Sequence, residues 1–143
     1  MKLATIGYEA STLPDVITAL KRAGVEVVID VRAVAASRKA GFSKTLLGNS
    51  LKNEGIDYVH LQKLGTPKPG RDAARSGDIA RMNRIFEAHL EEPEVQLALA
   101  QATELATRRK AALLCYEADP AGCHRSIVAD RIRARTGVEV ENL

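Results

Sequence analysis

The chain of 143 residues has no tryptophan, only five phenylalanine and tyrosine residues in all, and only two cysteines. Two cysteines are too few for a disulfide framework, which excludes a small secreted scaffold held by several disulfides. No apolar run approaches the roughly 20 residues of a membrane span, and the first residues are typical of a strand rather than a secretory signal. We therefore expect a cytoplasmic protein with no membrane partner, in which Cys115 and Cys123 are thiols.

Motifs for bound cofactors are also missing. The segment from Thr5 to Ser11 contains one glycine, so it carries neither a Walker loop nor the three-glycine dinucleotide motif, and we expect no cofactor. Four side chains are of the types that bind zinc, but seven residues separate the two cysteines, whereas structural zinc ligands come in pairs two to four residues apart. We therefore predict no metal site from these four residues, which are His60, Cys115, Cys123 and His124.

The composition is that of one globular domain. Hydrophobic residues make up 45% of the chain and charged residues 27%, which are ordinary values, and 143 residues can bury one core. The formal net charge of +3 conceals a basic middle third, because residues 31–84 contain 11 Lys and Arg against 4 Asp and Glu. Such a surplus occurs both on solvated surfaces and on surfaces that bind nucleic acid, and the composition leaves both interpretations open.

Short apolar runs alternate with segments of helical periodicity. Strands are indicated over residues 3–7, 25–29, 56–61 and 111–115, and residues 138–140 are a candidate for a fifth. Helices are indicated after Ser11, over residues 44–54, 78–90 and 93–109, and from near Cys123 to a stop at Gly137. The segment from Leu64 to Arg71 has two prolines and two glycines, and we predict that it is an irregular loop.

This alternation predicts an α/β fold. We expect residues 1–143 to form a single domain with a mostly parallel sheet of four to five strands and helices on both faces. In such sheets ligands bind outside the carboxyl ends of the strands, so side chains that follow the predicted strands should converge there. Asp30 and Arg32 follow one buried strand, and Cys115 and Glu117 follow another. We expect Asp30, Arg32, Glu117 and Arg125 to lie in one cleft at this edge.

The segment from Leu113 to Ser126 has the layout of an anion-binding site. It runs from a buried strand through a polar turn into a helix, whose first N–H groups favour a negative charge. Arg125 could add a bidentate contact, and a helix start beside His124 would lower the pKa of Cys123 and make its thiol a nucleophile. The alternative is that Cys123 or Ser126 only caps the helix.

Two sets of candidate residues follow from these patterns. Asp30 is a candidate for catalysis, although it could equally hold Arg32 or Arg125 in an ion pair. The full catalytic set is Asp30, Glu117 and Cys123, and the anion-binding set is Arg32, His124, Arg125 and Ser126. In the basic segment, the candidates for contacts with the phosphates of nucleic acid are Arg38, Lys39, Lys44, Lys68 and Arg71.

Several short motifs, taken in order, resemble the bacterial and archaeal DUF488 family. They lie at residues 5–8, 29–32, 37–43, 58–65 and 114–126, so the resemblance covers nearly the whole chain. It implies a compact α/β domain and carries over no activity or substrate. From the residues, we expect the chain to bind or process a phosphate-bearing ligand, either a small molecule or nucleic acid. The alternative is a module that binds a ligand or a protein without catalysis.

Overall fold

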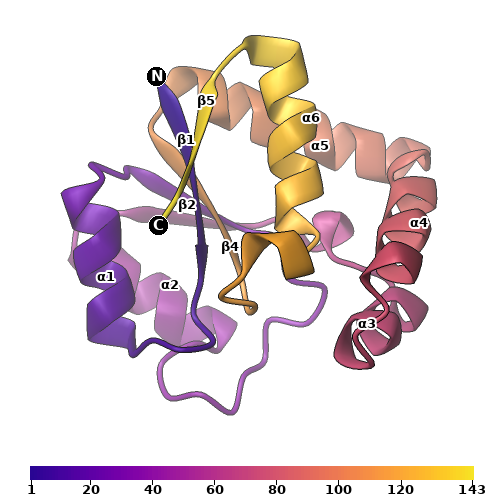
Figure 1. Ribbon diagram of the computed structural model, residues 1–143. Helices are drawn as coiled ribbons and strands as arrows, with labels where there is room; N and C mark the ends of the chain where they lie inside the picture. The colour runs from indigo at the N-terminus through magenta and orange to yellow at the C-terminus, as the bar shows by residue number, and fades with distance from the viewer.

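Five parallel strands form one sheet at the centre of the computed structural model, which describes residues 1–143 (Figure 1). Their order across the sheet is β3-β2-β4-β1-β5, so β4 lies between the two earliest strands of the chain. The strands are β1 (Lys2–Gly7), β2 (Val27–Asp30), β3 (Asp57–His60), β4 (Ala111–Cys115) and β5 (Glu139–Asn142). The predicted α/β class with a parallel sheet is confirmed.

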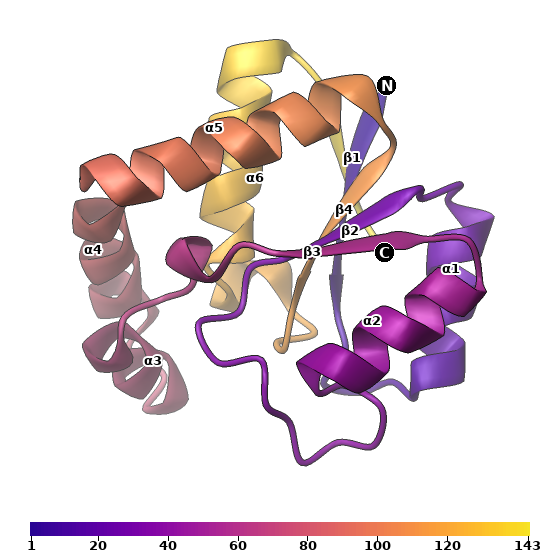
Figure 2. The same ribbon diagram turned by 180° about the vertical axis from the view of Figure 1, so that it is seen from behind.

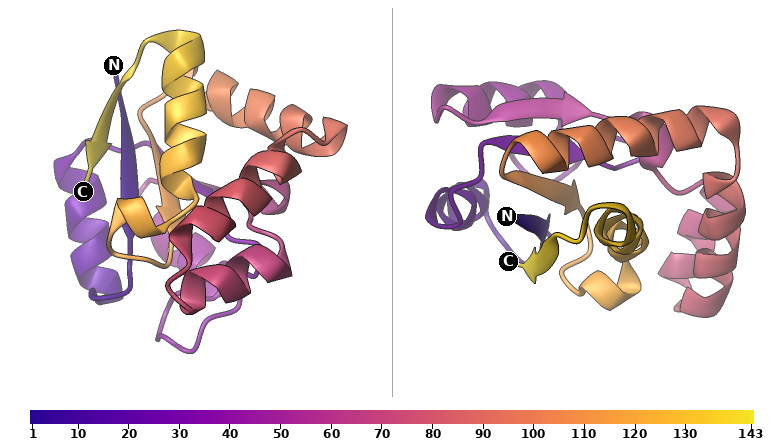
Figure 3. Two further views of the ribbon diagram at one scale, coloured as in Figure 1. Left: turned by 45° about the vertical axis from the view of Figure 1, so that its right-hand side comes forward. Right: turned by 90° about the horizontal axis from the view of Figure 1, so that it is seen from above.

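Helices cover both faces of this sheet (Figure 2). On one face lie α1 (Leu13–Arg22) and α2 (Lys44–Asn53), and on the other lie α5 (Pro93–Arg108) and α6 (Arg125–Thr136). The hairpin of α3 (Lys68–Arg75) and α4 (Ile79–Leu90) packs beside the sheet rather than over its middle (Figure 3). None of these helices combines the length and the apolar character that crossing a membrane would require.

The position of β4 in the middle of the sheet explains why its sequence is apolar throughout. All five of its residues are buried, and successive side chains point to opposite faces of the sheet. Ala111 and Leu113 therefore join the core beneath α5 and α6, whereas Ala112 and Leu114 join the core beneath α1 and α2. Cys115, the last residue of β4, is also buried and brings its side chain to the carboxyl edge of the sheet.

Local signals set most helix ends, and one segment predicted to be a loop forms the start of a helix. Thr12 caps α1 in a capping box with Asp15, and Gly137 ends α6 in the left-handed conformation with φ of 75°. The segment Leu64–Arg71, predicted to be an irregular loop, instead begins at the last residue of a 3-10 turn, η1 (Gln62–Leu64), and contains the start of α3 at Lys68. The prolines do not prevent this, because a proline in the first turn of a helix lacks only an N–H group that the helix leaves unpaired.

Candidate functional site

A cavity of about 600 Å³ opens at the carboxyl ends of β1, β2 and β4. Its walls come from the residues that follow these strands, from α3 and α4, and from the turn that precedes α6. The lining side chains with polar or ionisable groups are Tyr8, Glu9, Arg32, Ser37, Arg38, Thr66, Arg71, Arg75, Cys115, Tyr116, Glu117, Cys123 and His124. The cavity therefore lies at the edge where a parallel sheet is expected to bind ligands.

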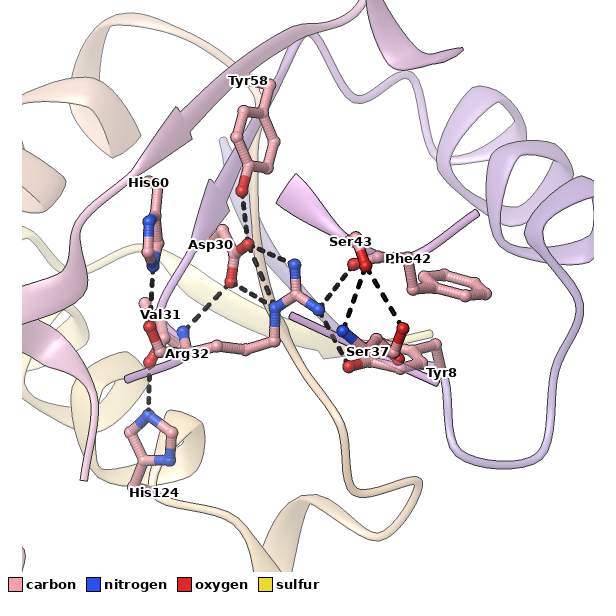
Figure 4. Close-up of polar contacts among 10 residues, drawn as sticks. All are labelled: Tyr8, Asp30, Val31, Arg32, Ser37, Phe42, Ser43, Tyr58, His60 and His124. Atoms are coloured by element: carbon pink, nitrogen blue, oxygen red, sulfur yellow. Dashed lines mark hydrogen bonds and ion pairs between the residues drawn. The ribbon is translucent and has the colours of Figure 1, made fainter. Parts of the chain in front are cut away.

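A buried ion pair between Asp30 and Arg32 lies at one side of this cavity, which Arg32 lines (Figure 4). The Nη2 atom of Arg32 lies 2.7 Å from Oδ2 of Asp30, and the two side chains are 5% and 0% exposed. The Nη1 atom of Arg32 donates to the hydroxyl of Tyr8 and to the carbonyl of Phe42, at 2.9 and 2.7 Å. Tyr58 donates its hydroxyl proton to Asp30. Through these contacts the pair connects the end of β1, the end of β2, strand β3, and the loop that follows β2.

The same contacts limit what Asp30 and Arg32 can offer to a ligand. Burial lowers the pKa of Arg32, but hydrogen bonds and charge from Asp30 outweigh this effect, so the net pKa is raised and the guanidinium stays charged. Its charge is compensated by the carboxylate beside it. Of the five N–H groups of a guanidinium, only one on Nη2 is left without a protein partner. Asp30 lies behind Arg32 and does not line the cavity.

Two thiols and an imidazole meet at the cavity. The Nδ1 atom of His124 lies 3.8 Å from the sulfur of Cys115 and 3.7 Å from the sulfur of Cys123. On the other side of the ring, Nε2 lies 2.8 Å from the carbonyl oxygen of Val31 (Figure 4). Because a carbonyl only accepts, Nε2 carries the proton and donates it, which leaves Nδ1 of the neutral ring as an acceptor toward the sulfurs. Glu117 Oε2 lies 3.3 Å from the sulfur of Cys115.

The sequence pattern did not predict this group of metal-ligand types. The sulfurs of Cys115 and Cys123 and a ring nitrogen of His124 all lie within 4.8 Å of one another, and all three residues are buried. The seven residues between the cysteines cross from the end of β4 to the turn before α6, so distance along the chain is no guide to distance in space. His60, the fourth residue considered, does not belong to this group, and its Nε2 bonds to the carbonyl oxygen of Arg32.

The expectation of a lowered pKa for Cys123 is wrong. Burial, followed by the neighbouring Cys115, raises the pKa of Cys123 well above its ordinary value. The physical reason is burial: the sulfur of Cys123 accepts from the N–H of Arg125 at the start of α6, but the residue is only 2% exposed and lies beside the thiol of Cys115. For His124, burial lowers the pKa, but its contacts with Cys123 and the Val31 carbonyl outweigh this effect and the pKa is raised.

Arg125 is buried and turned away from the cavity, which it does not line. Its guanidinium donates to the backbone carbonyls of Glu117 and Ala118, and so holds the turn between β4 and α6. Gly7 makes room for this arrangement, because a Cβ atom there would lie 1.7 Å from the Glu117 carbonyl oxygen. Ser126 also lies outside the cavity lining and donates its hydroxyl proton to the carbonyl of Cys123.

The predicted residues thus divide between the cavity and its support. We expected Asp30, Arg32, Glu117 and Arg125 to share one cleft, and only Arg32 and Glu117 line it. Cys123 and His124 line it as well. The sequence contains no direct signal for this division. Arg32 follows a buried strand and Arg125 begins a helix, and nothing local shows that only the first side chain points into the cavity.

The basic residues predicted to contact nucleic acid do not all gather in one place. Arg38 and Arg71 line the cavity, together with Arg75, which the sequence marks only as part of the basic segment. The other three predicted residues do not line the cavity. Lys39 donates to the carbonyl of Glu9, Lys68 forms an ion pair with Asp72, and Lys44 is the exposed first residue of α2. The spacing of Arg71 and Arg75 by four residues puts both on one face of α3.

Comparison with known protein families gives one match. A family model described as Domain of unknown function DUF488 matches residues 12–132, which span most of the chain and include all the motifs at the strand ends except the first. No curated protein and no solved structure matches the chain.

Proposed function

The chain belongs to the DUF488 family, whose function is unknown, and on this premise we propose that it binds a small phosphate-bearing molecule in the cavity at the carboxyl ends of the strands. The observation that supports this proposal most is the set of three arginines, Arg38, Arg71 and Arg75, on the wall of one cavity.

The charges on the cavity wall favour an anion. Neither Arg38 nor Arg71 forms an ion pair, and Arg71 donates to the neutral carbonyl oxygen of Thr66. Arg75 has one exposed partner, Asp72, at 3.5 Å. Two glutamates, Glu9 and Glu117, also line the cavity, and the three arginines outnumber them. Guanidinium groups bind phosphate oxygens with paired, charge-assisted hydrogen bonds, which makes phosphate a suitable ligand.

The shape of the site favours a small molecule over a polymer. A cavity of about 600 Å³ lies within the range of roughly 300–1,000 Å³ typical of small-molecule sites. A nucleic-acid surface would instead need a continuous row of free cations, whereas Lys39 and Lys68 are engaged by protein groups. Of the residues predicted to be catalytic, Glu117 and Cys123 line the cavity, and catalysis by them remains a prediction separate from binding.

Calorimetric titration of the chain with inorganic phosphate, ribose 5-phosphate and a nucleoside monophosphate tests this proposal, with the matching ribose and nucleoside as controls. We expect the phosphate-bearing members to bind and the others to fail. Arg71→Gln should weaken binding about tenfold to a hundredfold, since a charged hydrogen bond contributes about 1.5–3 kcal/mol. Arg84→Gln is the matched control, because Arg84 is exposed on α4 and does not line the cavity.

Three outcomes would contradict the proposal. The first is no binding of any phosphate-bearing probe, and the second is an equal loss of affinity in both arginine variants. The third is salt-dependent binding of a single-stranded oligonucleotide that is far tighter than binding of the monophosphate. In this outcome, Arg84→Gln would weaken the binding of the oligonucleotide as much as Arg71→Gln does. That result would favour a nucleic-acid surface outside the cavity.

A further inference from the structure

We propose that Cys115, Cys123 and the Nδ1 atom of His124 form a binding site for a thiophilic divalent metal ion, with zinc as the best fit and the fourth coordination position open to the cavity. This inference goes beyond the proposed function and does not depend on it, because it rests on the ligand atoms themselves. The ion would be held at the point where the central strand and α6 meet.

The three donor atoms already have nearly the spacing that a tetrahedral ion requires. With Zn–S bonds of about 2.3 Å and Zn–N bonds of about 2.0–2.1 Å, the sulfur–nitrogen edge of a tetrahedron is about 3.6 Å. The two sulfur–nitrogen distances in the structure are 3.8 and 3.7 Å. All donor atoms lie within 4.8 Å of one another, so small side-chain movements would bring them onto a single ion.

The environment of His124 is that of a metal-binding histidine. A ligating imidazole almost always donates its second N–H group to a carbonyl or carboxylate, which fixes both the tautomer and the orientation of the ring. Here Nε2 lies 2.8 Å from the carbonyl oxygen of Val31, and Nδ1 is directed to the sulfurs. The ring also packs edge-on against Phe86, with centroids 5.0 Å apart, so its orientation is held from two sides.

The donor set indicates which ion would bind. Two sulfurs and one imidazole nitrogen select zinc and other thiophilic ions over magnesium and calcium, which require oxygen ligands. Binding would deprotonate both thiols, so each divalent ion taken up releases two protons to solvent and leaves two thiolate–metal bonds. The thiols would then be ligands, which accounts for two buried cysteines that face a polar cavity.

Three protein ligands leave one coordination position, as in catalytic zinc sites of the Cys₂His type. All three ligands line the cavity, so that position is accessible to water or to an oxygen of a bound molecule. Glu117 has a carboxylate oxygen 3.3 Å from the sulfur of Cys115, which places a carboxylate beside the ion without making it one of the three ligands. The site thus has the composition of a reactive centre rather than of a closed structural one.

Cobalt(II) titration of the full chain, reduced and freed of metal by a chelator, provides the test. We expect thiolate-to-cobalt charge-transfer absorption and intense visible bands of tetrahedral cobalt, both saturating at one equivalent per chain and displaced by zinc. His124→Gln should abolish the tetrahedral spectrum, as should Cys115→Ser and Cys123→Ser. The matched control is His60→Gln, which removes a nearby histidine whose Nε2 bonds to the carbonyl oxygen of Arg32, and it should keep the spectrum.

A second measurement on the unaltered chain covers the case in which a variant fails to fold. Zinc, but not magnesium, should protect both cysteines from alkylation and release two protons per ion in unbuffered solution. No cobalt–thiolate absorption by the reduced wild-type chain would overturn the proposal, as would an unchanged spectrum in the folded cysteine variants. Rapid formation of a Cys115–Cys123 disulfide under mild oxidant, without metal uptake by the reduced form, would instead indicate a redox pair. Arg71→Gln should leave the cobalt spectrum unchanged, so failure of phosphate binding and failure of metal binding are distinguishable.

Discussion

The imidazole of His124 donates from Nε2 to the carbonyl oxygen of Val31, at 2.8 Å, and so joins the start of α6 to the end of β2 across 93 residues of sequence. This bond places the proton of the neutral ring on Nε2, because the carbonyl can only accept, and it leaves Nδ1 as the acceptor that faces the two sulfurs. The ring orientation is therefore set by the backbone of the sheet and not by the thiols.

Asp30→Asn should destabilise the fold strongly. The substitution keeps the shape of the side chain but leaves the buried charge of Arg32 without its partner, and breaking a buried ion pair typically costs about 3–5 kcal/mol. The free energy of unfolding in urea measures the effect. Glu54→Gln is the control, since it breaks the exposed pair with Lys21, which should contribute less than about 1 kcal/mol. Equal losses in the two variants would show that the buried pair is not special.

Gly7→Ala should destabilise the chain and displace the turn that carries Glu117. The new Cβ atom would lie 1.7 Å from the carbonyl oxygen of Glu117, so the backbone must shift, at a cost of about 1–3 kcal/mol or more. Gly122→Ala is the matched control, because its Cβ would meet no atom within 4 Å, and its effect should stay within about 0.5 kcal/mol. Thermal unfolding of both variants checks this, and equal melting temperatures would be evidence against the close contact.

Stability should fall at alkaline pH because of Tyr58. Burial, followed by the hydrogen bond to Asp30, raises the pKa of Tyr58 in the folded chain above its unfolded value. A group with a raised folded pKa contributes stability that is present below the unfolded pKa, about 10 for tyrosine, and is lost as the pH rises beyond it. The free energy of unfolding between pH 9 and about 11 should therefore decline.

Tyr58→Phe should flatten that decline and lower the stability at neutral pH, since it removes the hydrogen bond to Asp30. Tyr116→Phe, which removes an exposed hydroxyl without a hydrogen-bond partner, should keep the slope of the wild type. If the slope persists unchanged in Tyr58→Phe, another group is responsible for the alkaline loss.

In the metal-free chain, Cys123 should react slowly with iodoacetamide near neutral pH. Burial and the neighbouring Cys115 raise its pKa, so the rate should keep increasing with pH beyond the ordinary thiol value of about 8.5. Mass spectrometry of labelled peptides over a pH series resolves Cys123 from Cys115. In Cys115→Ser, which removes the neighbouring thiol, the midpoint for Cys123 should move to lower pH. A wild-type midpoint near neutrality would restore the interpretation of an activated nucleophile.

The strands and helices could be predicted from the sequence because their signals are local. The apolar run 111–115 is the buried strand β4, the helix over 93–109 differs from α5 by one residue, and Gly137 ends α6. The location of the site at the carboxyl edge followed from the parallel arrangement alone, since that edge is common to all such sheets. The start of α3 was missed, because its prolines are compatible both with a loop and with a first helical turn.

The arrangement of the candidate site was decided by tertiary structure. The turn between β4 and α6 folds back onto the end of β4, and this places Cys115 next to Cys123 and His124. Whether a side chain points into the cavity or behind it depends on how the turn folds, as Arg125 shows by donating to the carbonyls of Glu117 and Ala118. The pKa of Cys123 depends on burial in the same way. Periodicity along a chain indicates neither the direction of such a side chain nor the pKa of a thiol, because both depend on how the turn between β4 and α6 folds and packs against the end of β2.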